Sequence, residues 1–216
     1  MASSETPAQE VGPAGPSSIQ KKVPEQIAEI KAPHPEKTIV VFFQDECRFG
    51  QQGTLTRKWA KRGSRPTAVR QTEYNSLGVI AAASPQTGQA EAILSPVLNT
   101  EILNQFLDQF SRSLAADVQA VMIWDGAGFH TSHDLQVPSN VTLIKLPPYS
   151  PELNGIENLW HDLRSHFWSN RTYADNDDLF EVAESTWCKN CLNPELIKSV
   201  RAKSDTHTRS ELLGSV

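Results

Sequence analysis

The chain has 216 residues, a formal net charge of −5 and a hydrophobic content of 38%, which suits one domain with an ordinary core. No apolar run approaches the roughly 20 residues of a membrane-spanning helix, and the first residues lack the pattern of a secretory signal. Three cysteines are too few for a disulfide framework. We therefore expect a cytoplasmic protein. Its acidic balance argues against binding nucleic acid through its net charge alone.

Proline and small polar residues dominate residues 1–36, which contain six of the 14 prolines. Such a composition cannot bury enough apolar surface to offset the entropy of ordering, so we expect a disordered leader there. The interpretation that follows is a folded domain over residues 37–195 and a C-terminal tail over residues 196–216.

The predicted elements follow in chain order. A nearly continuous apolar run is typical of a strand buried on both faces, and flanking runs around a Pro-Gln-Thr-Gly turn predict a hairpin. An apolar residue at every third or fourth position behind an Asn-Thr cap predicts a helix, and two short buried strands and two helices come after it. These elements are expected over residues 37–45, 76–84, 89–97, 100–114, 120–125, 141–146, 155–170 and 175–190. This mixed order predicts an α/β fold in which helices cover a sheet.

Two aspartates end predicted strands: Asp45 in "FFQDECRFG" and Asp125 in "MIWDGAGFH". If these strands are parallel neighbours, both carboxylates emerge at the same edge of the sheet. Glu157, near the start of a later helix, could face them. Three carboxylates in one place repel each other unless a cation neutralises them, and their hard oxygen atoms suit Mg²⁺ or Mn²⁺.

Ordinary structural roles also account for each carboxylate taken singly. Asp45 and Asp125 could begin Asx-turns. Glu157 lies three residues after Asn154 and could be the acidic member of a capping box.

The sequence motifs that contain these carboxylates resemble those of a known family. "QDECRFG", "WDGAGFH" and "LPPYSPELNGIENLW" resemble the three catalytic motifs of the mariner-type transposase superfamily, in its bacterial insertion-sequence branch. "TLTRKWAKRGSRP" is similar to the basic segment that follows the first motif. The resemblance implies a ribonuclease H-like fold and a catalytic, metal-binding triad of Asp45, Asp125 and Glu157 with two Mg²⁺ or Mn²⁺ ions. Such enzymes cut phosphodiester bonds at transposon ends and join the 3′-hydroxyl to target DNA.

The chain departs from the family pattern at Gly155, where proline is usual, and it shows no helix-turn-helix segment ahead of residue 37. The expected partners are double-stranded DNA, a separately encoded helix-turn-helix chain and a second copy in a homodimer on DNA, with a nucleoid location. The alternative is a non-catalytic, transposase-derived DNA-binding or interaction module.

Further residues are expected to bind DNA or support the cluster. Six basic residues and no acidic one lie between residues 57 and 70, and the run favours phosphate contacts over a merely solvated surface. They are Arg57, Lys58, Lys61, Arg62, Arg65 and Arg70. Trp59 among them is expected to anchor the segment by packing. His130 and Asn154 are expected to support the carboxylates. Glu46 is a possible alternative ligand, although strand alternation predicts it on the face opposite Asp45, and the isolated Cys188–Cys191 pair does not predict a zinc site.

Overall fold

The structure is a computed structural model, and it describes residues 25–200 except 54, 58, 66, 68–69, 126–131 and 147–153. Its centre is a five-stranded sheet in the order β3-β2-β1-β4-β5. The strands are β1 (Thr38–Gly50), β2 (Ser76–Ala83), β3 (Ala90–Ser95), β4 (Val118–Trp124) and β5 (Val141–Lys145). The helices are α2 (Thr100–Ser113), α3 (Glu157–His166), α4 (Asn176–Thr186) and α5 (Pro194–Val200), with a π-helical turn η3 (Trp187–Cys191) after α4.

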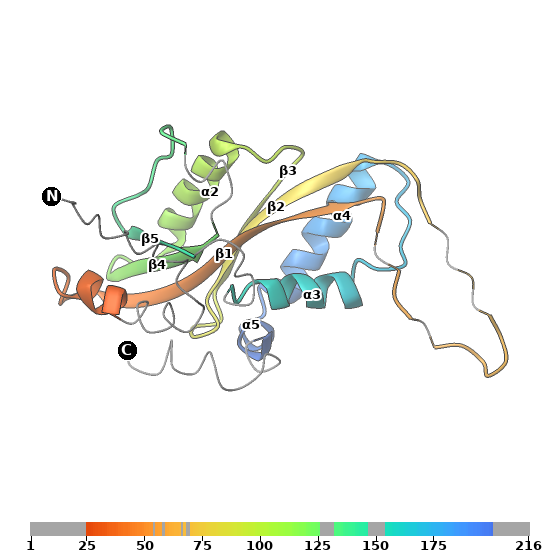
Figure 1. Ribbon diagram of the computed structural model, residues 1–216, viewed down its shortest axis with the longest axis horizontal. Helices are drawn as coiled ribbons and strands as arrows, with labels where there is room; N and C mark the ends of the chain where they lie inside the picture. The colour runs from red at the N-terminus through yellow and green to blue at the C-terminus, as the bar shows by residue number, and fades with distance from the viewer. Residues whose placement is uncertain are drawn as a thin grey trace, which may run out of the picture.

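Strand β1 forms the middle of the sheet (Figure 1). Its first half pairs in parallel with β4, ending at Phe43 opposite Ile123, and its second half pairs only with the antiparallel β2. The apolar run of β1 is buried on both faces, as parallel central strands require. Beyond Phe43, the edge of β1 that faced β4 is no longer paired with β4.

The two faces of the sheet have separate cores. Even-numbered β1 residues such as Phe42 pack with the buried face of α2, where the Phe42 and Phe110 rings meet edge to face at 4.8 Å. Odd-numbered residues such as Phe43 pack with α3, α4, η3 and α5. The α/β layering predicted from the sequence is therefore confirmed, and Asp45, as an odd-numbered residue, faces the α3 layer.

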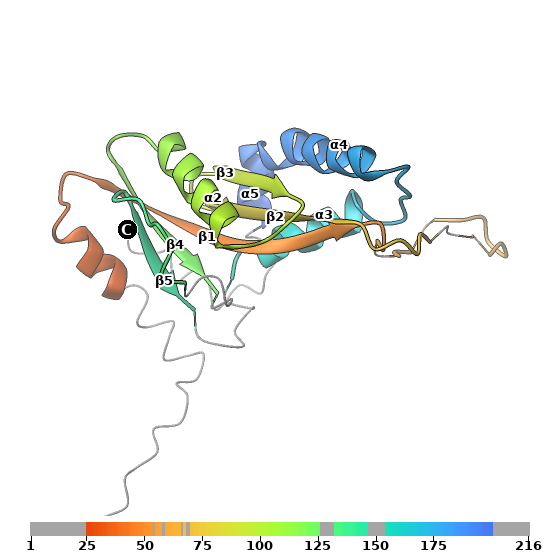
Figure 2. The same ribbon diagram turned by 90° about the horizontal axis from the view of Figure 1, so that it is seen from above.

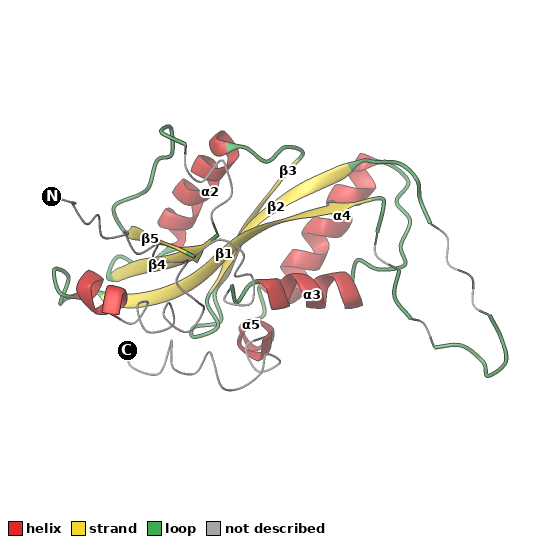
Figure 3. Cartoon of the chain, viewed as in Figure 1, coloured by secondary structure: helices red, strands yellow, loops and turns green. Residues whose placement is uncertain are grey.

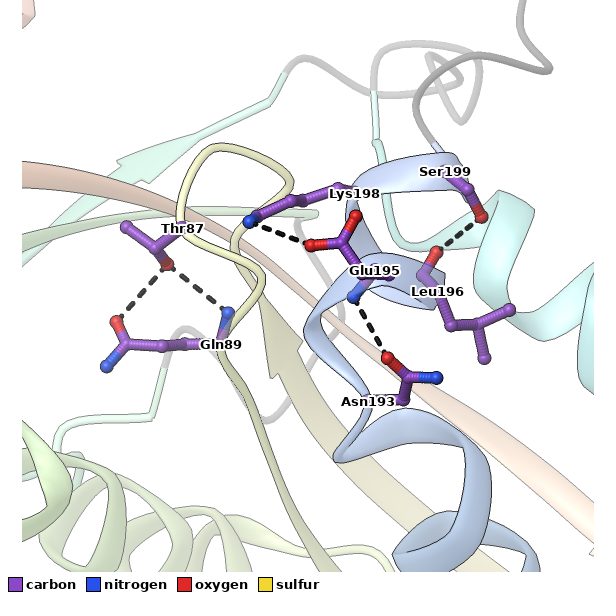
Figure 4. A network of polar contacts seen from close by, with 7 residues as sticks. All are labelled: Thr87, Gln89, Asn193, Glu195, Leu196, Lys198 and Ser199. Atoms are coloured by element: carbon purple, nitrogen blue, oxygen red, sulfur yellow. Dashed lines mark hydrogen bonds and ion pairs between the residues drawn. The ribbon is translucent and has the colours of Figure 1, made fainter.

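The β2–β3 hairpin turns at Gly88, which has a positive φ of 81°. This turn lies beside the start of α5 (Figure 4), and a Cβ at Gly88 would come within 2.7 Å of Pro194. Glycine is needed here both for the left-handed backbone and for the close approach. Lys198 and Glu195 form an ion pair on the same stretch of α5.

The N-terminal boundary differs from the expected disordered leader over residues 1–36. Residues 25–31 are helical, and Ile27 is only 4% exposed, within the core on the α3 side of the sheet. The sequence did not predict this short helix because a single buried isoleucine gives almost no helical periodicity, and the surrounding residues are rich in proline. In the part of the chain that the structure describes, no helix is long and apolar enough to cross a membrane.

Candidate active site

The parallel pairing of β1 and β4 sets the position of two carboxylates. Phe43 lies opposite Ile123, so Asp45 and Asp125, each two residues further on, leave the paired region at the same edge of the sheet. Asp45 continues along β1 opposite Ala81 of β2, whereas Asp125 directly follows the end of β4. The shared edge predicted for the two aspartates is observed, but the prediction that Asp45 ends its strand is wrong, because β1 runs on to Gly50.

Asp45 lies in an unusual environment for a carboxylate, because it is only 8% exposed. The indole N–H of Trp160 in α3 donates to its Oδ2 at 3.0 Å. The pKa of Asp45 is raised to about 7, mainly by burial and also by the nearby charges of Glu157 and Glu46, while the hydrogen bonds from the Glu46 backbone and Trp160 act in the opposite direction. Asp45 is therefore held ready to accept a cation, which would relieve both the desolvation and the repulsion.

Glu46, the alternative ligand considered from the sequence, lies with the two aspartates, although strand alternation alone favours the opposite face. One ligand oxygen each from Asp45, Glu46 and Asp125 lie within 4.8 Å of one another, and Gln44 holds Glu46 through a 2.6 Å hydrogen bond from its amide. No pairing with β4 is present at this point of β1, so the edge of the strand beside Asp45 and Glu46 is open. The adjacent Asp-Glu pair in "QDECRFG" is the sequence signal that pointed to it.

The start of α3 is fixed to the strand that carries Asp45. The buried Asn154 donates from its side-chain amide to the carbonyl of Gln44 at 2.9 Å, and its Oδ1 accepts from the N–H of Ile156 at 3.4 Å. Helix α3 begins at Glu157 with no side-chain cap. Asn154 Oδ1 accepts from the N–H of Ile156, and the N–H of Glu157 donates to the backbone carbonyl of Asn154 at 3.3 Å, which differs from the side-chain bond of a capping box. Glu157 instead lies near enough to Asp45 to act on it electrostatically.

Gly155 explains the departure from the family pattern. A Cβ at this position would lie 2.9 Å from Cδ2 of Phe43 and 3.1 Å from its Cγ, and Phe43 is itself buried. The backbone that leads into α3 thus packs directly on β1, two residues before Asp45. A proline, which carries a Cβ, would collide there.

The donor set fits a hard divalent cation. Carboxylate oxygens are the ligands that Mg²⁺ and Mn²⁺ prefer, and opposite ligands of one octahedral ion lie about 4.2 Å apart. The oxygens of Asp45, Glu46 and Asp125, within 4.8 Å of one another, are close to that spacing. Glu157 is the fourth carboxylate on this side, from α3.

The basic segment lies in the long loop between β1 and β2, which projects beyond the sheet in two perpendicular views (Figures 1 and 2) and has no helix or strand in its described part (Figure 3). Its described basic residues are all exposed: Arg57, Lys61, Arg62, Arg65 and Arg70. Trp59 is fully exposed as well, so its prediction as a packing anchor is wrong. Lys58 lies outside the described residues.

Polar side chains fix both ends of this loop to the segment after α3. Asn170, in a left-handed conformation with φ 55°, bonds the backbone and hydroxyl of Thr56 through its amide. Gln71 and the backbone of Tyr173 exchange two hydrogen bonds of 2.6 and 2.7 Å. These bonds replace the packing that Trp59 was expected to supply.

The remaining sequence candidates do not add to the cluster. Cys191 is buried while Cys188 is exposed, and both are free thiols. Neither belongs to a potential metal-binding group among the described residues. His130 lies outside the described residues.

Comparison with known proteins identifies the family. The chain matches the DDE superfamily endonuclease family over residues 40–180, a range that contains all three acidic motifs. This chain belongs to the DDE superfamily of endonucleases. The resemblance of its motifs to those of DDE transposases is thereby confirmed.

Relatives and solved structures agree with this assignment. An uncharacterized protein, y4pE/y4sA of Sinorhizobium fredii, is 36% identical over 129 residues, which are 60% of this chain and 96% of that protein. The catalytic domain of Mos1 mariner transposase superposes with a TM-score of 0.52 at 12% identity and covers 85% of both chains. In the Mos1 strand transfer complex the TM-score is 0.54 at 12% identity, over 94% of this chain and 63% of that one. These superpositions confirm the ribonuclease H-like fold.

Proposed function

We propose that this domain is the catalytic domain of a DNA transposase, which cuts phosphodiester bonds at transposon ends and joins the freed 3′-hydroxyl to target DNA. One observation carries the proposal. In a chain of the DDE endonuclease family, parallel β1 and β4 bring Asp45 and Asp125 into one acidic group with Glu46, and α3 presents Glu157 to Asp45.

Asp45, Asp125 and Glu157 would hold the divalent cation, and Glu46 is a further candidate ligand. A bound Mg²⁺ or Mn²⁺ supplies Lewis-acid stabilisation of a transferring phosphoryl group and lowers the pKa of an attacking hydroxyl or water. Trp160 would orient the Asp45 carboxylate, and Asn154 would hold α3, and with it Glu157, against β1. Mos1 mariner transposase has been crystallised as a paired end complex with Mn and with Mg, and two ions per site stay our expectation here.

The loop between β1 and β2 would bind the DNA backbone through Arg57, Lys58, Lys61, Arg62, Arg65 and Arg70. The five described members of this set are exposed, and none forms an ion pair with another described residue. Their charge is therefore available to phosphates. Contacts of this kind position DNA without reading its sequence.

Recognition of transposon ends would come from a helix-turn-helix unit, and a homodimer would bring two ends together. His130 would support the carboxylates, in the motif that follows Asp125. These three assignments are predictions that follow from the resemblance to the transposase family.

A nicking assay tests the function. Supercoiled plasmid is incubated with the protein in Mn²⁺, Mg²⁺ or EDTA, and duplex binding is followed in parallel by fluorescence anisotropy. We expect metal-dependent nicking that Asp125→Asn abolishes, with DNA binding retained, since the variant removes a ligand and a negative charge. The matched control, Asp117→Asn, changes an exposed aspartate just before β4 and should nick normally.

The alternative function, a non-catalytic DNA-binding module, gives a different result in the same assay. It predicts DNA binding with no metal-dependent nicking by the wild-type protein. Nicking that survives Asp125→Asn would instead place the chemistry outside the acidic group.

A further inference from the structure

A small cavity of about 60 Å³ lies where the end of β1 meets the last turn of α3. Arg48, Phe49 and Gly50 of β1 line one side, and Arg164 of α3 and Trp168 line the other. Neither arginine belongs to the basic segment predicted from the sequence. The cavity has room for one small group rather than for a base or a sugar.

Two arginines line this cavity, and neither has an acidic partner among the described residues. Among the described residues, no carboxylate forms an ion pair with Arg48 or Arg164, and Arg164 lies beside the thiol of Cys47. A cation in the last turn of α3 is favoured by the helix dipole, which accounts for Arg164 alone. It does not account for a second cation brought to the same place by a different element, because like charges repel.

The wall of the cavity strengthens any charge interaction within it. Phe49 and Trp168 pack with ring centroids 4.5 Å apart, and their apolar surface lowers the local dielectric. Trp168 is 4% exposed, and its indole N–H is buried with no hydrogen-bond partner in the described structure. A buried donor of this kind is rare in folded proteins. Together with the two arginines that line the same cavity, this unpartnered donor favours an anion there.

The position of the cavity relates it to the carboxylates. Arg48 is three residues beyond Asp45 on a strand, a separation of about 10 Å. Arg164 is seven residues beyond Glu157 on a helix, again about 10 Å. The cavity also precedes Arg57, since Gly53 lines it. Along the chain, the carboxylates, the cavity and the basic segment follow in that order.

We propose that Arg48 and Arg164 form a binding site for a single backbone phosphate of the DNA strand that crosses the carboxylates. This inference rests on the proposed function. Guanidinium groups match the geometry of phosphate oxygens and can bond them two at a time. A phosphate held here fixes the strand about 10 Å from the reacting one and supplies register rather than sequence preference.

The test measures duplex binding by fluorescence anisotropy in EDTA over a series of salt concentrations, with a labelled duplex of arbitrary sequence as the probe. Each phosphate that loses its cationic partner should lower the slope of log K against log salt by about 0.9. We expect this loss in the double variant Arg48→Gln/Arg164→Gln. The double variant Arg48→Lys/Arg164→Lys keeps both charges and should retain the wild-type slope, which also covers the case of a glutamine variant that fails to fold.

The matched control is Arg112→Gln, because Arg112 lies on α2, across the sheet from α3, and is paired with Asp108. It should bind with the wild-type slope. The inference is overturned if the glutamine double variant keeps that slope, or if Arg112→Gln loses as much. Plasmid nicking distinguishes a failure of the proposed function from a failure of the phosphate site. If the wild type nicks plasmid but the glutamine variant binds DNA with the wild-type slope, the function is supported and the phosphate site is not. If the glutamine variant has a reduced slope but the wild type does not nick plasmid, the phosphate site is supported and the proposed catalytic function is not.

Discussion

The indole N–H of Trp160 donates a 3.0 Å hydrogen bond to Oδ2 of Asp45. Trp160 is fully buried on α3, one helical turn after Glu157. The same side chain therefore holds one carboxylate of the acidic group and sets the rotation of the helix that carries another. An outer partner of this kind orients a metal ligand without touching the metal.

Trp160→Phe should weaken Mn²⁺ binding by about 10- to 100-fold, the usual cost of losing an outer-shell partner. The variant keeps a six-membered aromatic ring in the core and removes the pyrrole part of the indole with its N–H donor. Titration calorimetry measures the change. Trp168→Phe is the control, since it removes an indole N–H that has no partner in the described structure. Equal Mn²⁺ affinities for the wild type and Trp160→Phe would show that this bond does not position Asp45.

The raised pKa of Asp45, about 7 against the ordinary 3.8, makes the stability of the metal-free protein depend on pH. Between these two values the folded state binds more protons than the unfolded state, so stability falls as pH rises through this window. The fall attributable to Asp45 should reach about 4 kcal/mol by neutral pH. Urea denaturation in EDTA at pH 4.5–7.5 measures it.

Asp45→Asn should remove this part of the pH dependence, and the control Asp117→Asn should not. If the wild type and Asp45→Asn have parallel pH profiles, Asp45 is not a buried carboxylate with a raised pKa.

Gly155→Ala should destabilise the protein by about 1–3 kcal/mol, since an added methyl group would overpack the contact with Phe43. Gly53→Ala is a matched comparison, because its added Cβ would make only an ordinary contact of 3.5 Å with the carbonyl of Trp168. Chemical denaturation of the two variants should show a loss for the first and little change for the second. A Gly155→Ala protein as stable as the wild type would contradict the close packing of the α3 start on β1.

Ile27→Ala should cost about 2–5 kcal/mol, as other large-to-small changes in cores do, although it lies in the segment expected to be a disordered leader. Glu29→Ala, exposed on the same short helix, should cost little. Thermal melting distinguishes the two. No loss of stability in Ile27→Ala would return the start of the folded domain to residue 37.

The sequence predicted the framework of the site because its signals are local. Runs of β-branched and aromatic residues predicted β1 and β4, and each run ends near an aspartate. If the two strands are parallel neighbours, Asp45 and Asp125 must lie at the same edge of the sheet. The helices that cover the sheet also followed from their periodicity. The family motifs assigned Glu157 to the site, a role that spacing alone could not separate from that of a capping residue.

The relationships that sequence patterns missed depend on tertiary structure. Glu46 joins the acidic group at a point of β1 that lies beyond its pairing with β4, a feature that strand alternation does not describe. Trp160 reaches Asp45 across 115 positions of sequence, and Arg48 and Arg164, which line one cavity, are similarly far apart in sequence. Trp59 was expected to pack, but Asn170 and Gln71 fix the ends of its loop instead and leave its ring exposed. Periodicity describes a residue's own element and carries no information on these partners.

The central claim is that Asp45 and Asp125 bind a divalent cation in one site. Anomalous diffraction from a crystal of the wild-type protein soaked in Mn²⁺ tests this claim most directly. We predict an anomalous peak in direct contact with a carboxylate oxygen of both aspartates, and no such peak in Asp125→Asn crystals soaked in the same way. Mn²⁺ bound elsewhere in the wild type, with Asp45 and Asp125 both outside its coordination sphere, would contradict the account.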